Sequence, residues 1–269
     1  MRRPDMSPAK PSRKVPEFTE NIWICGINPV YEALRGWTTG LSRLLVARRS
    51  ADNRVTALEK HARELHLQVE HLDREMLSEL VGHGHHQGVA LRCRGFPYAD
   101  EDAFLSRSVE ELAPLLLLDS IQDPQNLGAV LRSGCCLGAK GVVVPKDRAT
   151  AVTGAVIKVA AGAASLIPVV QVTNLVRTME KLKDAGLWVV GLDLQGDQSL
   201  HEADLSMPIG LVVGSEHKGL RPLVREHCDL LLHIPVYGPL QSLNAATAAA
   251  IALAEIQRQR CSGTFTRQG

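Results

Sequence analysis

The sequence predicts an α/β protein in which a small N-terminal α/β domain precedes a larger domain with a mostly parallel sheet. Two observations support this fold class. In the second half of the chain, short runs of leucine and β-branched residues alternate with turns and helical patterns, which is typical of parallel strands covered on both faces. At 269 residues with 45% hydrophobic content, the chain is also long for one compact domain. We therefore expect two domains.

The N-terminal part divides into a tail and a domain. Residues 1–20 predict a disordered basic tail, because proline, serine and basic residues occur there without a hydrophobic period. The hydrophobic pattern over residues 21–94 predicts the small α/β domain. Its expected strands are 22–25, 42–46, 67–72 and 88–94, and its expected helices are 28–35, 53–64 and 74–81.

The C-terminal part begins after a linker at 95–113 that is rich in acidic and aromatic residues. Residues 114–269 predict the larger domain, with alternating strands and helices. The expected strands are 115–119, 141–145, 167–172, 187–193, 209–214 and 230–235. An alanine-rich helix over 243–260 is long enough to pack along the sheet.

Charge is distributed unevenly along a chain whose formal net charge is only +1. Residues 1–98 carry 15 Lys and Arg against 11 Asp and Glu, whereas residues 99–269 carry 15 against 18. This excess of positive charge indicates a polyanion contact in the N-terminal third.

Several classes of protein are not favoured. The chain has no apolar run long enough for a spanning helix and no signal-peptide pattern at its start, so we expect a soluble, cytoplasmic protein. The six cysteines lack CxxC spacing and the ten histidines form no HExxH, so neither a zinc site nor a disulfide scaffold is expected.

The first of three polar clusters, residues 119–132, follows the first strand of the larger domain and opens a helix. Ligands of open α/β sheets collect at the carboxyl ends of strands, so chemistry is expected here. Asn126 can either cap the helix or bind a substrate, and Gly128 allows a backbone or a phosphate to approach closely. Arg132 is offset from the apolar stripe of the helix, so it need not be buried. On this cluster alone, structural and functional roles are equally supported.

The second cluster, residues 211–220, ends a strand in a tight turn. Gly214 and Gly219 bound the turn, and Glu216 places a carboxylate at the strand end. The turn lacks the GxGxxG spacing of a dinucleotide site and the GK[ST] of a phosphate-binding loop. A simple connecting turn is the structural alternative.

The third cluster, residues 234–244, joins a strand to the last helix. Ser242 is a good helix N-cap by composition. Asn244 is expected inside the first turn, where a structural role is harder to find. Its amide can serve as donor and as acceptor to a ligand.

Together, in this order and at these spacings, the clusters resemble the signature motifs of the SpoU/TrmH (SPOUT) family of RNA ribose 2′-O-methyltransferases. The motifs are Asn-x-Gly-x-x-x-Arg at 126–132, Gly-x-Glu-x-x-Gly at 214–219 and Ser-Leu-Asn at 242–244. The resemblance covers about 115–260. Two N-terminal segments, 25–30 and 86–89, resemble the substrate-binding domain of the bacterial 23S ribosomal RNA guanosine-2′-O-methyltransferase branch.

The resemblance implies a catalytic domain whose parallel sheet carries a trefoil knot, a small RNA-binding domain before it, and a homodimer. It implies S-adenosyl-L-methionine as the cofactor and no metal. The positions that match cofactor-binding residues are Leu192, Gly214, Ile234, Leu243 and Asn244. The positions that match catalytic and substrate-facing residues are Asn126, Arg132, Glu216, Ser242 and Asn244.

One departure from the family pattern concerns the third motif. The family commonly continues Val-Ser-x-Ala after Ser-Leu-Asn, whereas this chain has Ala245 to Ala248 with an alanine, Ala246, in place of the second serine. A hydroxyl contact made by that serine is therefore in doubt.

The resemblance also gives a mechanism to test. Methyl transfer to a ribose hydroxyl needs no metal, so positioning and stabilisation of the developing alkoxide carry most of the acceleration. Arg132 stays protonated, so we expect it to orient the ribose and a neighbouring phosphate rather than to act as a base. The histidine-rich loop at 83–88 is expected to contact RNA, in preference to binding a metal.

The function that we expect is methylation of the ribose 2′-OH of a guanosine in large-subunit ribosomal RNA. Alternatives within the enzyme class are a transfer-RNA ribose methyltransferase and an antibiotic-resistance methylase that acts on ribosomal RNA. The alternative outside it is a non-catalytic RNA-binding protein. A dinucleotide-dependent oxidoreductase fits poorly, because the glycine fingerprint is missing.

Overall fold

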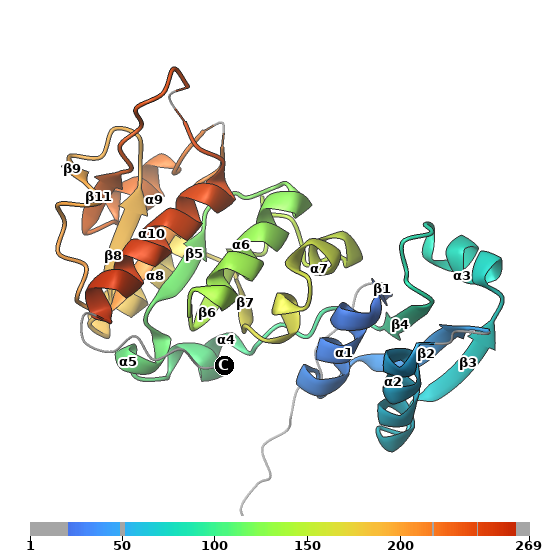
Figure 1. Ribbon diagram of the computed structural model, residues 1–269. Helices are drawn as coiled ribbons and strands as arrows, with labels where there is room; N and C mark the ends of the chain where they lie inside the picture. The colour runs from blue at the N-terminus through green and yellow to red at the C-terminus, as the bar shows by residue number, and fades with distance from the viewer. Residues whose placement is uncertain (1–20, 49–51, 217, 241, 262–269) are drawn as a thin grey trace, which may run out of the picture.

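The computed structural model of the chain describes residues 21–48, 52–216, 218–240 and 242–261 (Figure 1). It is an α/β protein with two sheets, as the sequence predicts. The tail predicted at 1–20 lies outside these residues. Among the described helices, none is long and apolar enough to cross a membrane.

The N-terminal sheet has four strands in the order β1-β4-β2-β3. Only β2 and β3 are parallel; β4 is antiparallel to both of its neighbours. The elements in chain order are β1 (Ile22–Cys25), α1 (Ile27–Gly36), β2 (Leu41–Ala47), α2 (Asn53–Glu64), β3 (Gln68–Leu72), α3 (Arg74–Val81) and β4 (Val89–Cys93). All seven were predicted, and α2 and α3 have the predicted bounds.

Local hydrogen bonds fix the helices of this domain. Asp52 caps α2 by accepting from the backbone N–H of Arg54. Gly26 has no side chain to cap α1, and the Oε1 atom of Gln87 accepts from Ile27 N–H at 2.9 Å instead. A residue just before β4 thus holds the start of α1 against the sheet.

The segment predicted as a linker contains two short helices. They are α4 (Glu101–Leu105) and α5 (Val109–Leu112). Asp100 caps α4, while Ser108 and Glu111 form a reciprocal capping box at the start of α5. These two helices were not predicted, because capping side chains stabilise helices too short to show a hydrophobic period.

The C-terminal sheet has seven strands, all parallel, in the order β7-β6-β5-β10-β8-β11-β9. The strands are β5 (Leu115–Leu118), β6 (Gly141–Pro145), β7 (Val169–Val172), β8 (Trp188–Leu192), β9 (Gln198–Ser199), β10 (Ile209–Val213) and β11 (Leu230–His233). The helical elements are α6 (Pro124–Cys136), α7 (Gly154–Ala160), η1 (Ala163–Ser165), α8 (Leu175–Asp184), α9 (Pro222–Glu226) and α10 (Ala245–Arg260). The two-residue strand β9 was not predicted.

Helices cover both faces of this sheet, which explains why its strands are apolar throughout. Along β5, Leu116 and Leu118 pack on the face that α6, α7 and α10 cover. Leu115 and Leu117 pack on the opposite face, under α4, α8 and α9.

The order of the strands changes direction between β5 and β10. From β5 the chain adds β6 and β7 on one side, whereas β8, β10 and β11 lie on the other. Such a switch point leaves a crevice outside the carboxyl ends of the strands, where open α/β sheets bind ligands.

The two parts of the chain meet where β1 lies beside α7 and where α1 lies beside η1 (Figure 1). Both contacts depend on glycine. A Cβ atom at Gly154 would lie 2.8 Å from the carbonyl oxygen of Trp23, and one at Gly36 would lie 2.4 Å from the carbonyl oxygen of Ser165. The backbones of the two parts are therefore in direct contact.

Candidate active site

A cavity of about 760 Å³ opens at the carboxyl ends of β8, β10 and β11. Its lining comes from residues 192–195, from described residues between 213 and 222, from Arg225 and Glu226 of α9, and from described residues between 231 and 248. Among its lining residues are four of the predicted cofactor-binding positions, Leu192, Gly214, Ile234 and Leu243. Two predicted catalytic residues, Glu216 and Ser242, also line it.

The tight turn after β10 requires glycine at its first position. A Cβ atom at Gly214 would lie 2.3 Å from the backbone carbon of Gly219. Ser215 and Gly219 exchange backbone hydrogen bonds of 3.1 and 2.8 Å across the turn, and Gly219 has φ +62°. The turn therefore folds back on itself, and its residues line the cavity.

A buried ion pair anchors the end of this turn. Asp119 is fully buried at the end of β5, and it accepts from Arg221 N–H at 2.7 Å and from Arg221 Nε at 2.5 Å. The Arg221 side chain is about one-third exposed. No role was predicted for either residue, although a carboxylate at the end of a leucine strand signals a buried partner. The pair positions the turn that forms one wall of the cavity.

Three predicted site residues, one from each polar cluster, meet beside the cavity. Asn126 Nδ2 donates to Glu216 Oε1 at 2.7 Å, and Asn244 Nδ2 donates to Asn126 Oδ1 at 2.8 Å. Asn244 Nδ2 also donates to Glu216 Oε1. We call this arrangement the Asn126–Glu216–Asn244 triangle. One carboxylate oxygen thus holds both amides, and the three side chains fix each other's orientation.

Asn244 is the N-cap of α10. Its Oδ1 atom accepts from the backbone N–H of Ala246 at 2.9 Å and of Thr247 at 3.3 Å. The expectations that Ser242 caps this helix and that Asn244 lies inside its first turn were therefore wrong. The oxygen of the Asn244 side chain caps the helix and the nitrogen binds the triangle. The start of α10 is therefore held at a fixed position relative to the site.

The first turn of α6 shows a similar division of roles. Asp123 caps the helix by accepting from Gln125 N–H, so Asn126 is not the cap. Asn126 is 7% exposed and is committed to the triangle.

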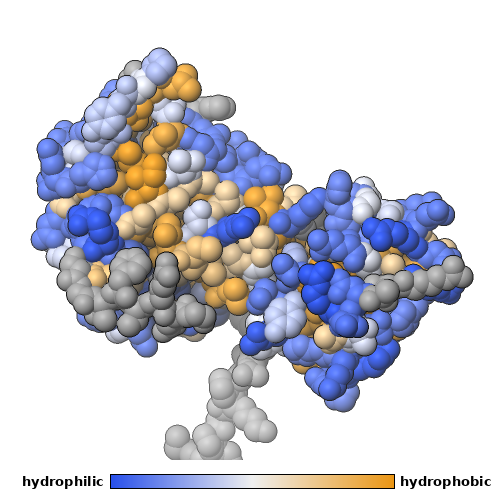
Figure 2. Space-filling model, in the orientation of Figure 1, coloured by the Kyte–Doolittle hydropathy of each residue, from blue (hydrophilic) through white to orange (hydrophobic). Residues whose placement is uncertain are grey.

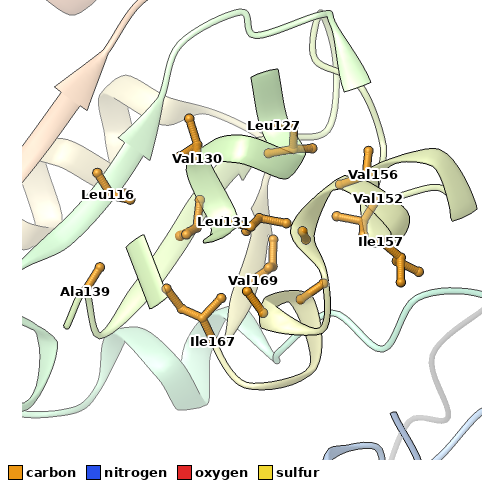
Figure 3. Packing of buried hydrophobic residues seen from close by; sticks show 14 of the residues in the cluster. Leu116, Leu127, Val130, Leu131, Ala139, Val152, Val156, Ile157, Ile167 and Val169 are labelled. Atoms are coloured by element: carbon orange, nitrogen blue, oxygen red, sulfur yellow. The ribbon is translucent and has the colours of Figure 1, made fainter. Parts of the chain in front are cut away.

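The close approach predicted at Gly128 is to α7. A Cβ atom there would lie 2.6 Å from Val159 Cβ. Figure 3 shows the apolar side chains of both helices in this contact, among them Leu127, Leu131 and Val156. The packing of α7 therefore sets the position of α6, and with it the position of Asn126.

Arg132 does not join the triangle. It follows Asn126 by six residues, which corresponds to about 9 Å along a helix, and its side chain is exposed. Within the described residues it has no hydrogen bond or ion pair. Ala246, where the family pattern has serine, is 6% exposed in the first turn of α10.

The histidine-rich loop at 83–88 divides into buried and accessible parts. His86 is fully buried; its Nδ1 atom accepts from Gly88 N–H at 3.0 Å and its Nε2 atom lies 3.0 Å from Ser78 Oγ. Burial, followed by the charges of Arg74 and His83, lowers the pKa of His86. His86 is therefore a neutral structural residue and is not available for contact with RNA.

The cysteines show no feature of a reactive site. All six are free thiols. Burial raises the pKa of Cys25 to about 11 and the pKa values of Cys93 and Cys228 to about 12, so these thiols stay protonated near neutral pH. Within the part of the chain that the structure describes, no cluster of three or more His, Cys, Asp or Glu side chains could hold a metal ion.

Two protein families match separate parts of the chain. Residues 113–254 match the SpoU rRNA Methylase family. Residues 23–99 match the family described as RNA 2′-O ribose methyltransferase substrate binding.

Individual relatives carry related names. The chain is 43% identical over 245 residues to an uncharacterized tRNA/rRNA methyltransferase from Mycolicibacterium smegmatis, covering 90% of this chain and 78% of the relative. It is 40% identical to the 23S rRNA (guanosine-2′-O-)-methyltransferase RlmB from Xanthomonas campestris, covering 90% and 98%. The structure is similar to that of the SpoU methyltransferase AviRb from Streptomyces viridochromogenes in complex with AdoMet, with a TM-score of 0.76, 27% identity, and coverage of 90% and 92%.

Proposed function

Because this chain belongs to the SpoU rRNA Methylase family, we propose that it transfers a methyl group from S-adenosylmethionine to the ribose 2′-hydroxyl of a guanosine in large-subunit ribosomal RNA. The observation that carries the proposal is the triangle beside the cavity. Residues 90 and 118 positions apart in sequence converge there, and each comes from a different family motif.

The cavity suits S-adenosylmethionine, which AviRb binds in its crystal structure. Its volume of about 760 Å³ lies within the ordinary range of roughly 300–1,000 Å³ for cofactor sites. Leu192, Ile234 and Leu243 would hold the cofactor between apolar walls, and the backbone at Gly214 would offer it hydrogen-bonding groups. When bound, the cofactor supplies an electrophilic methyl group on a sulfonium.

In this proposal the triangle orients the reacting groups. The Glu216 carboxylate holds Asn126 and Asn244, so these amides keep their positions while RNA and cofactor exchange. The bound cofactor would supply its methyl group in line with the ribose oxygen and leave as the neutral thioether, and the hydroxyl proton would pass to solvent or to a phosphate. Ser242 stands exposed at the cavity rim, where its hydroxyl can contact the ribose.

Arg132 orients the ribose and a neighbouring phosphate, as the motif implies. Its guanidinium has no carboxylate partner among the described residues, so its charge is available to RNA. Within one chain, Arg132 lies apart from the triangle. For Arg132 to act on the same ribose, either the RNA must reach both places or the Arg132 of a second protomer must lie beside the triangle.

We also propose that the chain is a homodimer. Figure 2 shows an apolar surface over α6 and α10, the two helices that pack side by side on one face of the catalytic sheet. Small or apolar residues such as Ala129, Ala250, Ile251 and Ala254 are partly or fully exposed on these helices. A contiguous apolar patch on a folded protein marks an interaction surface.

Some inferences from the family resemblance stay predictions. These are the trefoil knot, the domain boundaries at residues 94 and 114, and a cytoplasmic location, where ribosomal RNA is available.

The substrate is supported by two observations. A relative named as a 23S rRNA guanosine methyltransferase is matched over 98% of its length, and positive charge is concentrated in the N-terminal third. Transfer RNA is the alternative, because relatives such as the one from M. smegmatis are named as tRNA/rRNA methyltransferases.

The test is to incubate the full chain with methyl-labelled cofactor and, in separate reactions, with unmodified large-subunit ribosomal RNA and transfer RNA. We expect label in the ribosomal RNA alone. Label in transfer RNA alone would show that transfer RNA, and not ribosomal RNA, is the substrate. Label in neither RNA, together with no calorimetric binding of cofactor, would favour a non-catalytic RNA-binding protein.

A further inference from the structure

The N-terminal sheet has one face that is only partly covered. Alternate residues along its strands point to opposite faces. On the first face, Ile24, Leu44 and Leu91 pack under α1 and α2. On the second face, Leu45 packs against Leu77 of α3. Figure 1 shows α3 on one side of this sheet and α1 and α2 on the other. The short helix α3 leaves the remainder of the second face open.

Four side chains form a row across this open part. The register pairs Trp23 of β1 with Arg92 of β4, Arg92 with Arg43 of β2, and Arg43 with Gln68 of β3. Directly paired residues point to the same face, so one side chain from each strand joins the row. All four are partly or fully exposed. We call this set the Trp23 row.

The row combines an aromatic ring with positive charge. The Arg92 guanidinium carbon lies 5.9 Å from the centroid of the Trp23 ring, which is a cation–π contact. Arg43 donates to Glu70 at 2.9 Å, and its buried Nε has no hydrogen-bond partner among the described residues. Arg92 has no carboxylate partner in that part of the chain. The row therefore carries the positive charge of Arg92, which no carboxylate pairs, and one unsatisfied donor on Arg43.

The row continues toward the catalytic domain. The backbone carbonyl of Trp23 lies against Gly154 at the start of α7. Burial raises the pKa of the Cys25 thiol to about 11, and the nearby positive charge of Lys158 opposes the rise. The exposed Lys158 of α7 thus lies close to the strand that carries Trp23.

We propose that the Trp23 row binds a single-stranded segment of the RNA substrate, with a base stacked on the Trp23–Arg92 pair and phosphates on Arg92 and Arg43. This rests on the proposed function and names the surface by which the N-terminal domain holds RNA. An unpaired strand offers stacking faces and phosphates together, and sheet faces with aromatic and arginine side chains bind such strands. A protein partner would find only one large apolar side chain in the row.

The direct test measures equilibrium binding of a fluorescently labelled, mixed-sequence single-stranded RNA to the full chain without cofactor. We expect Trp23→Ala and Arg92→Gln each to weaken binding by about tenfold. Arg92→Gln should also reduce the dependence of log K on log salt by roughly 0.7, the loss of one phosphate contact. The matched control is Arg63→Gln, which removes an exposed charge on α2 at the other face of the sheet and should leave affinity within about twofold.

Two further variants separate binding from folding. Trp23→Phe keeps an aromatic face and should bind within about threefold of the wild type, and circular dichroism melts identify any variant that fails to fold. If folded Trp23→Ala and Arg92→Gln bind RNA as the wild type does, with an unchanged salt slope, the proposal is wrong. A changed oligomeric state with unchanged RNA affinity would assign the row to protein contact and would also overturn it.

Steady-state methyl transfer distinguishes this proposal from the proposed function. We expect the row variants to raise KM for RNA by about tenfold, with kcat and cofactor affinity unchanged. If the wild type binds RNA through the row but transfers no methyl group, the proposed function is wrong and the proposal for the Trp23 row still holds. Methyl transfer with an unchanged KM in the variants would refute the row alone.

Discussion

The two sheets of this protein present polar side chains in opposite ways. At the carboxyl ends of the strands of the catalytic sheet, Asn126, Glu216 and Asn244 bind one another. Asp119 is buried there against Arg221. On the open face of the N-terminal sheet, both arginines are partly exposed; Arg43 forms an ion pair with Glu70, whereas Arg92 has no carboxylate partner among the described residues. The difference matches the tasks that we propose: chemistry needs a fixed geometry, whereas a flexible polyanion is held by unsatisfied charge.

The largest effect is expected from Asn244→Ala. The substitution removes the donor to Asn126 and Glu216, so these two side chains are no longer held in place. It also removes the cap of α10, so the backbone N–H groups of the first turn lose their acceptor. Methyl transfer should fall by about 100-fold, and unfolding free energy by about 1 kcal/mol. Single-turnover kinetics and thermal melts measure the two effects. Asn244→Ser is the control, since it keeps a cap but not the amide. Near-normal turnover in either variant would contradict the role of the triangle.

Gly214→Ala should act on the cofactor rather than on RNA. Its Cβ atom would collide with the backbone of Gly219, so the turn must open. We expect cofactor affinity to fall by at least about tenfold and stability by about 2 kcal/mol, as for other overpacked sites. Calorimetry with S-adenosylmethionine measures the affinity, and Gly84→Ala, with free space around the added Cβ atom and no positive φ, is a control for the added methyl group. Unchanged affinity would remove the turn from the cofactor site.

Asp119→Asn tests the buried ion pair behind the same wall. The amide keeps the shape but loses the charge that faces Arg221. Since the Arg221 side chain is one-third exposed, we expect a loss of only about 1–2 kcal/mol in stability, less than for a fully buried pair. Chemical denaturation measures the loss, and cofactor affinity should fall a few-fold. A stable variant with weakened cofactor binding would show that the pair positions the turn without stabilising the fold.

Binding of RNA to the N-terminal sheet and binding of cofactor to the catalytic domain should differ in their dependence on salt. Raising ionic strength is expected to increase KM for RNA steeply, because each phosphate contact releases a counterion. Cofactor affinity should change little, since the lining of its cavity is largely apolar. Steady-state kinetics at two salt concentrations, with each substrate varied in turn, measure both. A cofactor KM that follows salt as steeply as the RNA KM would show that the division between the regions is wrong.

The smallest effect is a pH dependence of stability from His86. Its pKa is lowered in the folded protein, chiefly by burial, so the unfolded chain takes up a proton more readily. The stabilisation is fully present above the ordinary histidine pKa of about 6.5 and is lost as pH falls from there through the lower pKa of the folded state. Thermal melts at neutral and mildly acidic pH should show a larger decrease for the wild type than for His86→Asn. An equal decrease in both would assign the pH dependence to other groups.

The regular elements could be predicted because their period or their caps are local. Helix α2 begins after Asp52 and α3 after Asp73, and both have the predicted bounds. Composition could not decide whether Ser242 or Asn244 begins α10, because both residue types are good caps and helix ends are the least certain part of a pattern.

The candidate site was predictable as a set of residues but not as a geometry. The motifs identified Asn126, Glu216 and Asn244, yet the sharing of one carboxylate oxygen depends on strand order. The Trp23 row is similar: its members lie up to 69 positions apart, from Trp23 to Arg92, and only the register places them on one face. Tertiary pairing of this kind has no local signal in a single sequence.

The central claim is that this chain methylates a ribose hydroxyl of RNA. The most direct measurement is mass spectrometry of nucleosides from unmodified large-subunit ribosomal RNA after incubation with the full chain and S-adenosylmethionine, with Asn244→Ala in parallel. We predict 2′-O-methylguanosine as the new nucleoside with the wild type, and little or none with the variant. A methylated base in place of a methylated ribose, or no new nucleoside with a wild-type chain that binds the cofactor, would contradict the claim.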